Sequence, residues 1–364
     1  MMLWTIEPFD RIFPNSVTQT VTMDIEGGYL EGTMTPAGFS VSRLISTDLK
    51  NYLKSEYSPV ISENTDRRFA ATYKGEKMSI FDAVIQGIIQ GLTEFLPVSS
   101  SGHLSLYQHF TGNSGEAAGI YSILLHLGTL LAVMIAFWKD ILDMIKEFFS
   151  MAKEIVTGKF DKENMTGSRR MIFLLIISLV PLCFFYFVSD FYNSLSTDND
   201  IIVEGLCFLL TAALLIVSGK CVKTGGAIAE NMSWKQALGM GIMQGIAPLP
   251  GLSRSGSTIS TGLILGVSRE QAVAFSFIMG VPAVLAANIL EVPAAISGEV
   301  EINWLAAITG MVVSLIVGIG AIKTVKLLVK NDKFTKFAWY LIPLGVIIVA
   351  IGIFEKISGT VITI

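Results

Sequence analysis

Residues 90–103 read Gln-Gly-Leu-Thr-Glu-Phe-Leu-Pro-Val-Ser-Ser-Ser-Gly-His. They interrupt an apolar segment of about 30 residues, roughly 80–110. One membrane-spanning helix needs about 20 apolar residues and two need about 40, so this segment fits neither. The Pro-Val-Ser-Ser-Ser-Gly break in its middle predicts a re-entrant hairpin, a helix that enters the membrane, stops and returns to the same side.

A second segment, about 237–265, has the same design. Its break at 248–256 reads Pro-Leu-Pro-Gly-Leu-Ser-Arg-Ser-Gly. A shift of 154 residues places Gln90-Gly91 on Gln244-Gly245 and the Ser-x-Ser-Gly of the first break on that of the second. Chance similarity between apolar segments does not readily give both polar matches in register. We therefore predict two related halves, repeat one at about 80–218 and repeat two at about 234–354.

The composition points to lipid as the solvent of the remaining chain. Hydrophobic residues make up 52% and charged residues 15%, against about 25% charged in soluble domains. Long unbroken apolar runs predict helices. Six clear spans are expected at 120–138, 171–189, 201–218, 273–292, 304–322 and 338–354. The net charge of −4 comes without a basic stripe, which argues against nucleic-acid binding.

The loop charges indicate how these segments cross the membrane. Lysine and arginine gather in the loops 139–170, 219–236 and 323–337 and are absent from 111–119, 190–200 and 293–303. By the positive-inside rule the first three loops are cytoplasmic. The sides alternate correctly only if the two broken segments are re-entrant from opposite faces. The expected fold is an all-α polytopic membrane protein with six transmembrane helices and two re-entrant helical hairpins in an inverted-topology repeat.

The first 77 residues differ in character from the membrane domain at 78–364. They are polar and contain no apolar run of spanning length. Lys74-Gly-Glu-Lys77, directly before Met78, can be encoded by a purine-rich stretch that resembles a ribosome-binding site. We interpret Met78 as the natural start and 1–77 as translated leader, with a small accessory segment as the alternative.

The two breaks carry the residues expected to do chemistry. Ser and Gly suit helix N-termini, whose free N–H groups and dipole favour anions, so two such termini face to face would make a phosphate-sized cradle. A guanidinium inside a membrane is costly unless partnered, and its fork matches phosphate oxygens. Arg254 is therefore interpreted as a phosphate clamp, and the alternative is an internal ion pair with Glu94.

Two further residues offer acid–base or metal chemistry. Glu94 shares a helix face with Gln90; it could hold a divalent cation with phosphate oxygens, act as a base, orient His103, or pair with Arg254. His103 lies one turn after Ser100, so the two can touch as nucleophile and base, or the imidazole can protonate the leaving group. His126 is assigned to packing or a supporting hydrogen bond.

The stretch 90–103, together with the Pro-Gly-Leu-Ser-Arg-Ser-Gly-Ser-Thr of 250–258, resembles the two signature motifs of bacterial undecaprenyl-diphosphate phosphatases of the bacitracin-resistance type. The resemblance covers about 78–364. It implies catalytic roles for Glu94, Ser100, His103 and Arg254, with Ser253 and Thr258 in support. The full set of expected substrate contacts is Ser99, Ser101, Gly102, Gln244, Ser253, Ser255 and Thr258. The resemblance also implies Mg²⁺ or Ca²⁺ at Glu94 and Gln90. Gln90 replaces the first acid of the family's pair, which removes one carboxylate from that metal site.

The function implied is hydrolysis of undecaprenyl diphosphate to undecaprenyl phosphate and phosphate, which recycles the lipid carrier for cell-wall synthesis. The resemblance further implies the bacterial inner membrane, a site facing the periplasm, possible homodimerisation, and bacitracin sensitivity on loss of activity. A polyprenyl-phosphate flippase or a secondary transporter is the alternative that an inverted repeat favours. The other class of membrane lipid phosphatase is disfavoured, because its Lys/Arg-Pro motif and its second histidine with aspartate are missing.

Overall fold

A computed structural model of the chain describes residues 20–25, 28–35, 38–46, 78–111, 116–161, 165–187, 201–221, 225–297, 302–358 and 361–362. The chain divides into two units, Met1–Gly75 and Glu76–Ile364. Each unit is described by itself.

The first unit contains a three-stranded antiparallel sheet in the order β1-β2-β3. Its strands are β1 (Thr20–Ile25), β2 (Gly28–Thr35) and β3 (Gly38–Ser46), and the register between β2 and β3 shifts at Glu31/Gly32. The all-α prediction is wrong for these residues. A search for apolar runs overlooks them, because strands rich in Thr, Val, Tyr and Phe need no long apolar stretch.

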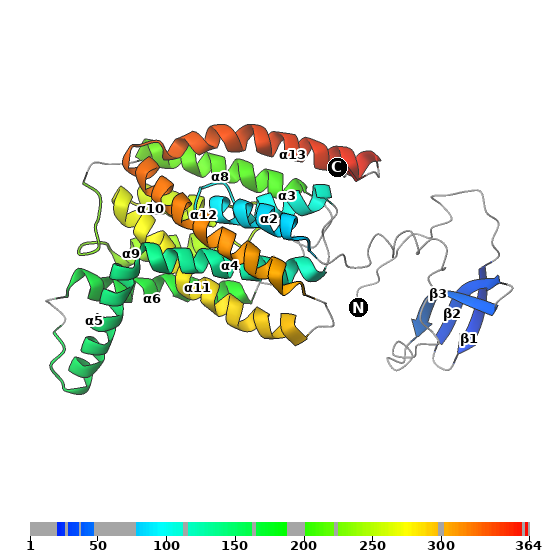
Figure 1. Ribbon diagram of the computed structural model, residues 1–364, viewed down its shortest axis with the longest axis horizontal. Helices are drawn as coiled ribbons and strands as arrows, with labels where there is room; N and C mark the ends of the chain where they lie inside the picture. The colour runs from blue at the N-terminus through cyan, green and yellow to red at the C-terminus, as the bar shows by residue number, and fades with distance from the viewer. Residues whose placement is uncertain are drawn as a thin grey trace. The chain divides into compact units, whose positions relative to one another are not determined.

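The second unit is helical (Figure 1). Repeat one contains α2 (Ile80–Thr93), α3 (Ser100–Thr111), α4 (Glu116–Ala136), α5 (Trp138–Val156), α6 (Gly167–Tyr186) and α8 (Ile202–Cys221). Repeat two contains α9 (Trp234–Ile246), α10 (Arg254–Ile264), α11 (Arg269–Ser297), α12 (Trp304–Lys330) and α13 (Ala338–Ser358), with the short 3₁₀ helix η4 (Phe334–Phe337) before α13.

The two broken segments are confirmed as helix pairs, α2 with α3 and α9 with α10. Corresponding serines start corresponding helices. The Ser79 hydroxyl caps α2, and Ser233, 154 residues later, caps α9. Likewise the Ser99 hydroxyl accepts from the Gly102 N–H at 3.2 Å, and the Ser253 hydroxyl caps α10 by accepting from the Gly256 N–H at 3.0 Å. The sequence repeat therefore corresponds to the same helix-capping structure in both halves.

Each half contributes a helix that packs against the other half, an arrangement that we call exchange packing. Helix α2 lies along α12 of the other half, and α9 lies along α6 of the other half. The glycines of the repeated motif allow these close crossings: a Cβ at Gly91 would overlap the Ser314 carbonyl of α12, and a Cβ at Gly241 would overlap the Ser178 carbonyl of α6. Small residues at membrane helix crossings let backbones approach in this way.

Four helical stretches of the described residues are long and apolar enough to cross a membrane. They are Gly167–Phe185, Ile202–Cys221, Trp304–Lys330 and Phe334–Ser358. A further apolar helix, Tyr121–Ala136, bends by 79° into α5. The prediction of a helical chain with several membrane-type helices is confirmed. Predicted spans 120–138 and 273–292 fall on α4 and α11, and residues 188–189 of another lie outside the described residues.

Candidate active site

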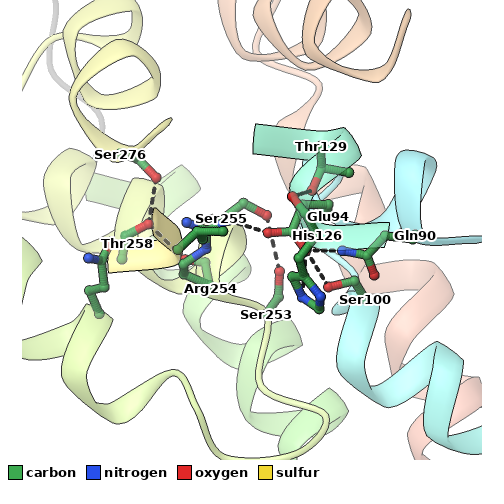
Figure 2. A network of polar contacts seen from close by, with 12 residues as sticks. Gln90, Glu94, Ser100, His126, Thr129, Ser253, Arg254, Ser255, Thr258 and Ser276 are labelled. Atoms are coloured by element: carbon green, nitrogen blue, oxygen red, sulfur yellow. Dashed lines mark hydrogen bonds and ion pairs between the residues drawn. The ribbon is translucent and has the colours of Figure 1, made fainter. Parts of the chain in front are cut away.

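The side chain of Glu94 is the centre of a polar network between the two breaks (Figure 2). Glu94 directly follows α2 and is only 7% exposed. Its Oε2 accepts hydrogen bonds from Gln90 Nε2 at 3.0 Å and from Ser100 Oγ at 2.6 Å. Its Oε1 pairs with Nη2 of Arg254. Both breaks therefore meet at one carboxylate.

Arg254 is the first residue of α10 and reaches Glu94 from the opposite half of the chain. The predicted meeting of these two residues is confirmed, and the internal ion pair considered as the alternative to a clamp is formed. Room for the guanidinium comes from Gly280 in α11, where a Cβ would overlap Nη1. The Arg254 side chain remains 25% exposed, so the cation stays accessible at the site.

The second break is held by hydroxyl groups. Thr258 Oγ1 donates to the Arg254 carbonyl at 2.7 Å and lies 2.6 Å from the Ser276 hydroxyl. Ser255 Oγ donates to the Leu96 carbonyl of the first break at 3.1 Å and lies 3.3 Å from the Ser253 hydroxyl. The three predicted substrate-contact residues of this break, Ser253, Ser255 and Thr258, thus hold the backbone in place.

The first break contains strained backbone. Ser99 has φ 73°, a conformation that costs a non-glycine residue about 1–2 kcal/mol. Its hydroxyl lies 3.2 Å from that of Ser101. A Cβ at Gly102 would overlap the Phe208 ring and come within 2.8 Å of the Gly251 Cα. Gly102 thus serves the close approach of the two breaks.

His103 does not pair with Ser100. Its Nδ1 lies 2.7 Å from the Ser99 carbonyl oxygen and its Nε2 lies 2.8 Å from the Tyr340 hydroxyl of α13. The ring stacks on Tyr340 at a centroid distance of 5.9 Å and packs edge-on against Phe208. The spacing of three residues allowed a contact with Ser100, but the rotamer of His103 turns the ring toward α8 and α13.

His126 of α4 takes the place beside Glu94. Its Nδ1 lies 2.8 Å from the Ser122 carbonyl oxygen, which fixes the ring, and its Nε2 lies 3.8 Å from Glu94 Oε2. The side chain is 30% exposed. The position agrees with the supporting role predicted for His126. The 154-residue shift places His126 on Gly280, which lies beside Arg254.

The two repeated glutamines differ in what they contact. Gln244 Nε2 donates to the Met279 carbonyl of α11 at 3.3 Å, whereas Gln90 Nε2 donates to Glu94. The Oε1 atoms of both are buried and have no hydrogen-bond partner among the described residues. Gln90 belongs directly to the site, and Gln244 supports α11 next to Gly280.

Both oxygens of Glu94 are occupied by N–H and O–H donors, so a divalent cation would have to displace some of them. Within the described residues there is no cluster of three or more His, Cys, Asp or Glu side chains suited to a metal. Mg²⁺, however, needs only one or two carboxylates when water and substrate phosphates complete its shell. The Glu94 carboxylate, with the Gln90 side chain beside it, is the group that would hold such an ion.

Comparison with known proteins places this arrangement in a family. The family model described as bacitracin resistance protein BacA matches residues 83–347. A protein of Alkaliphilus metalliredigens named undecaprenyl-diphosphatase is 37% identical over 277 residues, which cover 75% of this chain and 98% of that protein. Proteins of the same name from Treponema denticola and Methanosphaera stadtmanae are 37% and 34% identical, over 74% and 76% of this chain and 96% and 99% of their own.

These matches run through both breaks and extend over nearly the full length of each relative. The chain is a member of the bacitracin resistance protein BacA family.

Proposed function

We propose that the chain is a membrane phosphatase that hydrolyses undecaprenyl diphosphate to undecaprenyl phosphate and inorganic phosphate. The observation that carries this is the Glu94–Arg254 pair, in which the two halves bring a carboxylate and a guanidinium together at the starts of α3 and α10. The relatives named undecaprenyl-diphosphatase supply the substrate class.

In the proposed membrane topology, six transmembrane helices surround two re-entrant hairpins, α2–α3 and α9–α10. The exchange packing of α2 on α12 and of α9 on α6 supports an inverted repeat. The lipid tail would lie in the bilayer while the diphosphate reaches the breaks. The location is the bacterial inner membrane, with the site open toward the periplasm, and a homodimer remains a prediction.

Substrate binding would exchange partners at the ion pair. The guanidinium of Arg254 turns from Glu94 to phosphate oxygens, which it can hold bidentately. Glu94, with Gln90 beside it, would hold a divalent cation, Mg²⁺ or Ca²⁺, which would supply charge neutralisation. Helix N-termini at α3 and α10 add N–H groups that favour the anion.

The reaction breaks the phosphoanhydride P–O bond next to the terminal phosphorus. A new P–O bond forms to that phosphorus from the Ser100 hydroxyl or from water; with Ser100, water later releases the phosphate. Ser100 donates to Glu94 at 2.6 Å, which suits removal of its proton. The proposed catalytic set is Glu94, Ser100, Arg254 and His103. His126, at 3.8 Å from Glu94, is a second candidate proton carrier.

A phosphate-release assay in detergent tests the proposal. Purified protein supplied with a polyprenyl diphosphate should release inorganic phosphate, and EDTA should stop the release. A flippase or transporter would release none, because detergent leaves no second compartment. Replacing His103 and His126 by alanine, one at a time, identifies which imidazole the reaction needs.

A further inference from the structure

Helix α2 contains a buried amide that the proposed chemistry does not use. Gln86 is 1% exposed, and neither its Nε2 nor its Oε1 has a hydrogen-bond partner among the described residues. Buried amides are nearly always hydrogen-bonded, and an unpaired one destabilises the fold. A polar side chain in such a place indicates a ligand that satisfies it.

Gln86 belongs to a row of polar side chains on one face of α2. Asp82, Gln86, Gln90 and Glu94 follow each other at intervals of four residues, so each lies about 6 Å along the helix axis from the next. Asp82, at the half-buried start of the row, accepts from the Tyr107 hydroxyl at 2.7 Å. Glu94, at the other end, accepts from Gln90. The row therefore leads from the start of α2 to the candidate active site.

The second half of the chain shows that packing does not require this amide. The 154-residue shift places Gln86 on Met240 of α9, which is fully buried at 0% exposure. The same helix position thus accepts a thioether of similar length in the half that lacks a counterpart of Glu94, where Pro248 stands. The amide occurs only in the half that carries the carboxylate.

We propose that Gln86 and Gln90 hold buried water between them, and that this water supplies the site at Glu94 along the α2 row. A buried water needs two to four polar partners. Gln86 Nε2 and Oε1 and Gln90 Oε1 supply them, and all three atoms lack another partner within the part of the chain that the structure describes. Gln90 Oε1 can accept from this water while Gln90 Nε2 donates to Glu94.

The inference rests on the proposed hydrolysis, which consumes one water for each diphosphate cleaved. The water oxygen ends in the inorganic phosphate, and one proton leaves with the products. The α2 row offers that water a line of polar side chains from the start of the helix to Glu94.

Exchanging Gln86 for its repeat counterpart tests the supply role. In Gln86→Met, kcat for phosphate release should fall at least about tenfold, while KM for the lipid stays unchanged because no substrate contact is altered. Gln86→Asn, which keeps an amide, should recover part of the loss. Leu92→Met is the control. It introduces the same side chain at a position of α2 where Leu92 is 40% exposed, and it should leave kcat unchanged. Wild-type kcat in Gln86→Met would overturn the inference.

A structure at a resolution that shows ordered water tests the site without reference to activity or to the fate of the variant. Wild-type protein in lipid nanodiscs should show water within about 3.2 Å of both Gln86 and Gln90 Oε1. A dry amide at Gln86 would overturn the inference whether or not Gln86→Met folds. If water is present but the wild-type enzyme releases no phosphate, the water site stands and the proposed function fails.

Discussion

At the scale of single residues, the candidate site is a charge pair placed where a membrane protein would avoid one. A lone guanidinium or carboxylate inside apolar surroundings is costly, and pairing Arg254 with Glu94 offsets that cost. The pair also orients both groups before a ligand arrives. In the proposed function, phosphate oxygens replace Glu94 as the partner of Arg254 when the substrate binds.

Gly280 positions Arg254, although it contacts no ligand. Alanine there would push the guanidinium away, because its Cβ would overlap Nη1. Gly280→Ala should therefore lower kcat/KM for phosphate release by about 100-fold, the effect of misplacing a catalytic group by roughly 1 Å. Gly320→Ala, on a helix surface with nothing within 4 Å of the added Cβ, is the matched control and should behave as wild type. Equal activity in both variants would contradict the positioning role.

Much of the site could be predicted at the residue scale, but not all of it. The two motifs predicted that Glu94 and Arg254 meet, because each motif places a charged residue in an apolar segment, where it needs a partner. Whether His103 or His126 lies beside Glu94 depends on rotamers and on how α4 packs, which spacing along one helix does not determine. The positive φ of Ser99 is likewise not evident from the residue type, because serine rarely adopts this conformation.

At the scale of helices, the repeated glycines determine how the halves interlock. Gly241→Ala should destabilise the protein by about 1–3 kcal/mol, because the added Cβ meets the fixed Ser178 backbone. Gly239→Ala on the same helix meets only the flexible end of Leu265 and should cost much less. Thermal unfolding in detergent measures both, and similar melting temperatures for the two variants would argue against the interlock.

Helix α5 is attached to α6 by an ion-pair cluster whose strength should depend on pH. Arg169 donates to Glu147 at 2.6 Å and to Glu154 at 2.7 and 2.8 Å. The hydrogen bonds from Arg169 hold the pKa of Glu154 below its usual value. A lowered folded-state pKa means that the stabilisation is complete above the usual carboxyl pKa of about 4.3 and is lost as pH falls through the lowered value.

Hydrogen exchange of α5 should accordingly stay constant from neutral pH down to the usual carboxyl range, after correction for intrinsic rates, and increase only below it. Arg169→Gln should raise the exchange at all these pH values and remove the acid-dependent step. The exposed Asp143–Lys146 pair is the control, and Lys146→Gln should have no effect. If the acid-dependent step persists in Arg169→Gln, groups other than this ion-pair cluster cause it, which would contradict the prediction.

For the whole molecule, the sequence repeat and the loop charges predicted two related helical halves, and the exchange packing agrees with them. The strands β1, β2 and β3 were missed, because the length of apolar runs carries no information on short polar strands. The division after Gly75 lies within a few residues of the change in sequence character at Met78.

The membrane unit should work without the first 77 residues. The relatives match over 96–99% of their own length while covering 74–76% of this chain, and the family model begins at residue 83. A variant consisting of residues 78–364 should insert into the membrane and release phosphate at the rate of the full chain. Loss of activity on this deletion, with normal membrane insertion, would show that the first unit takes part in function.

The central claim is that Glu94 and Arg254 together act on the diphosphate of a polyprenyl lipid. Phosphate release by purified Glu94→Gln and Arg254→Lys variants tests it most directly, since glutamine keeps the shape without the charge and lysine keeps the charge without the fork. Each variant should lose at least about 100-fold in kcat/KM relative to wild type. Substantial release by both variants, with a wild-type enzyme that is itself active, would contradict the account.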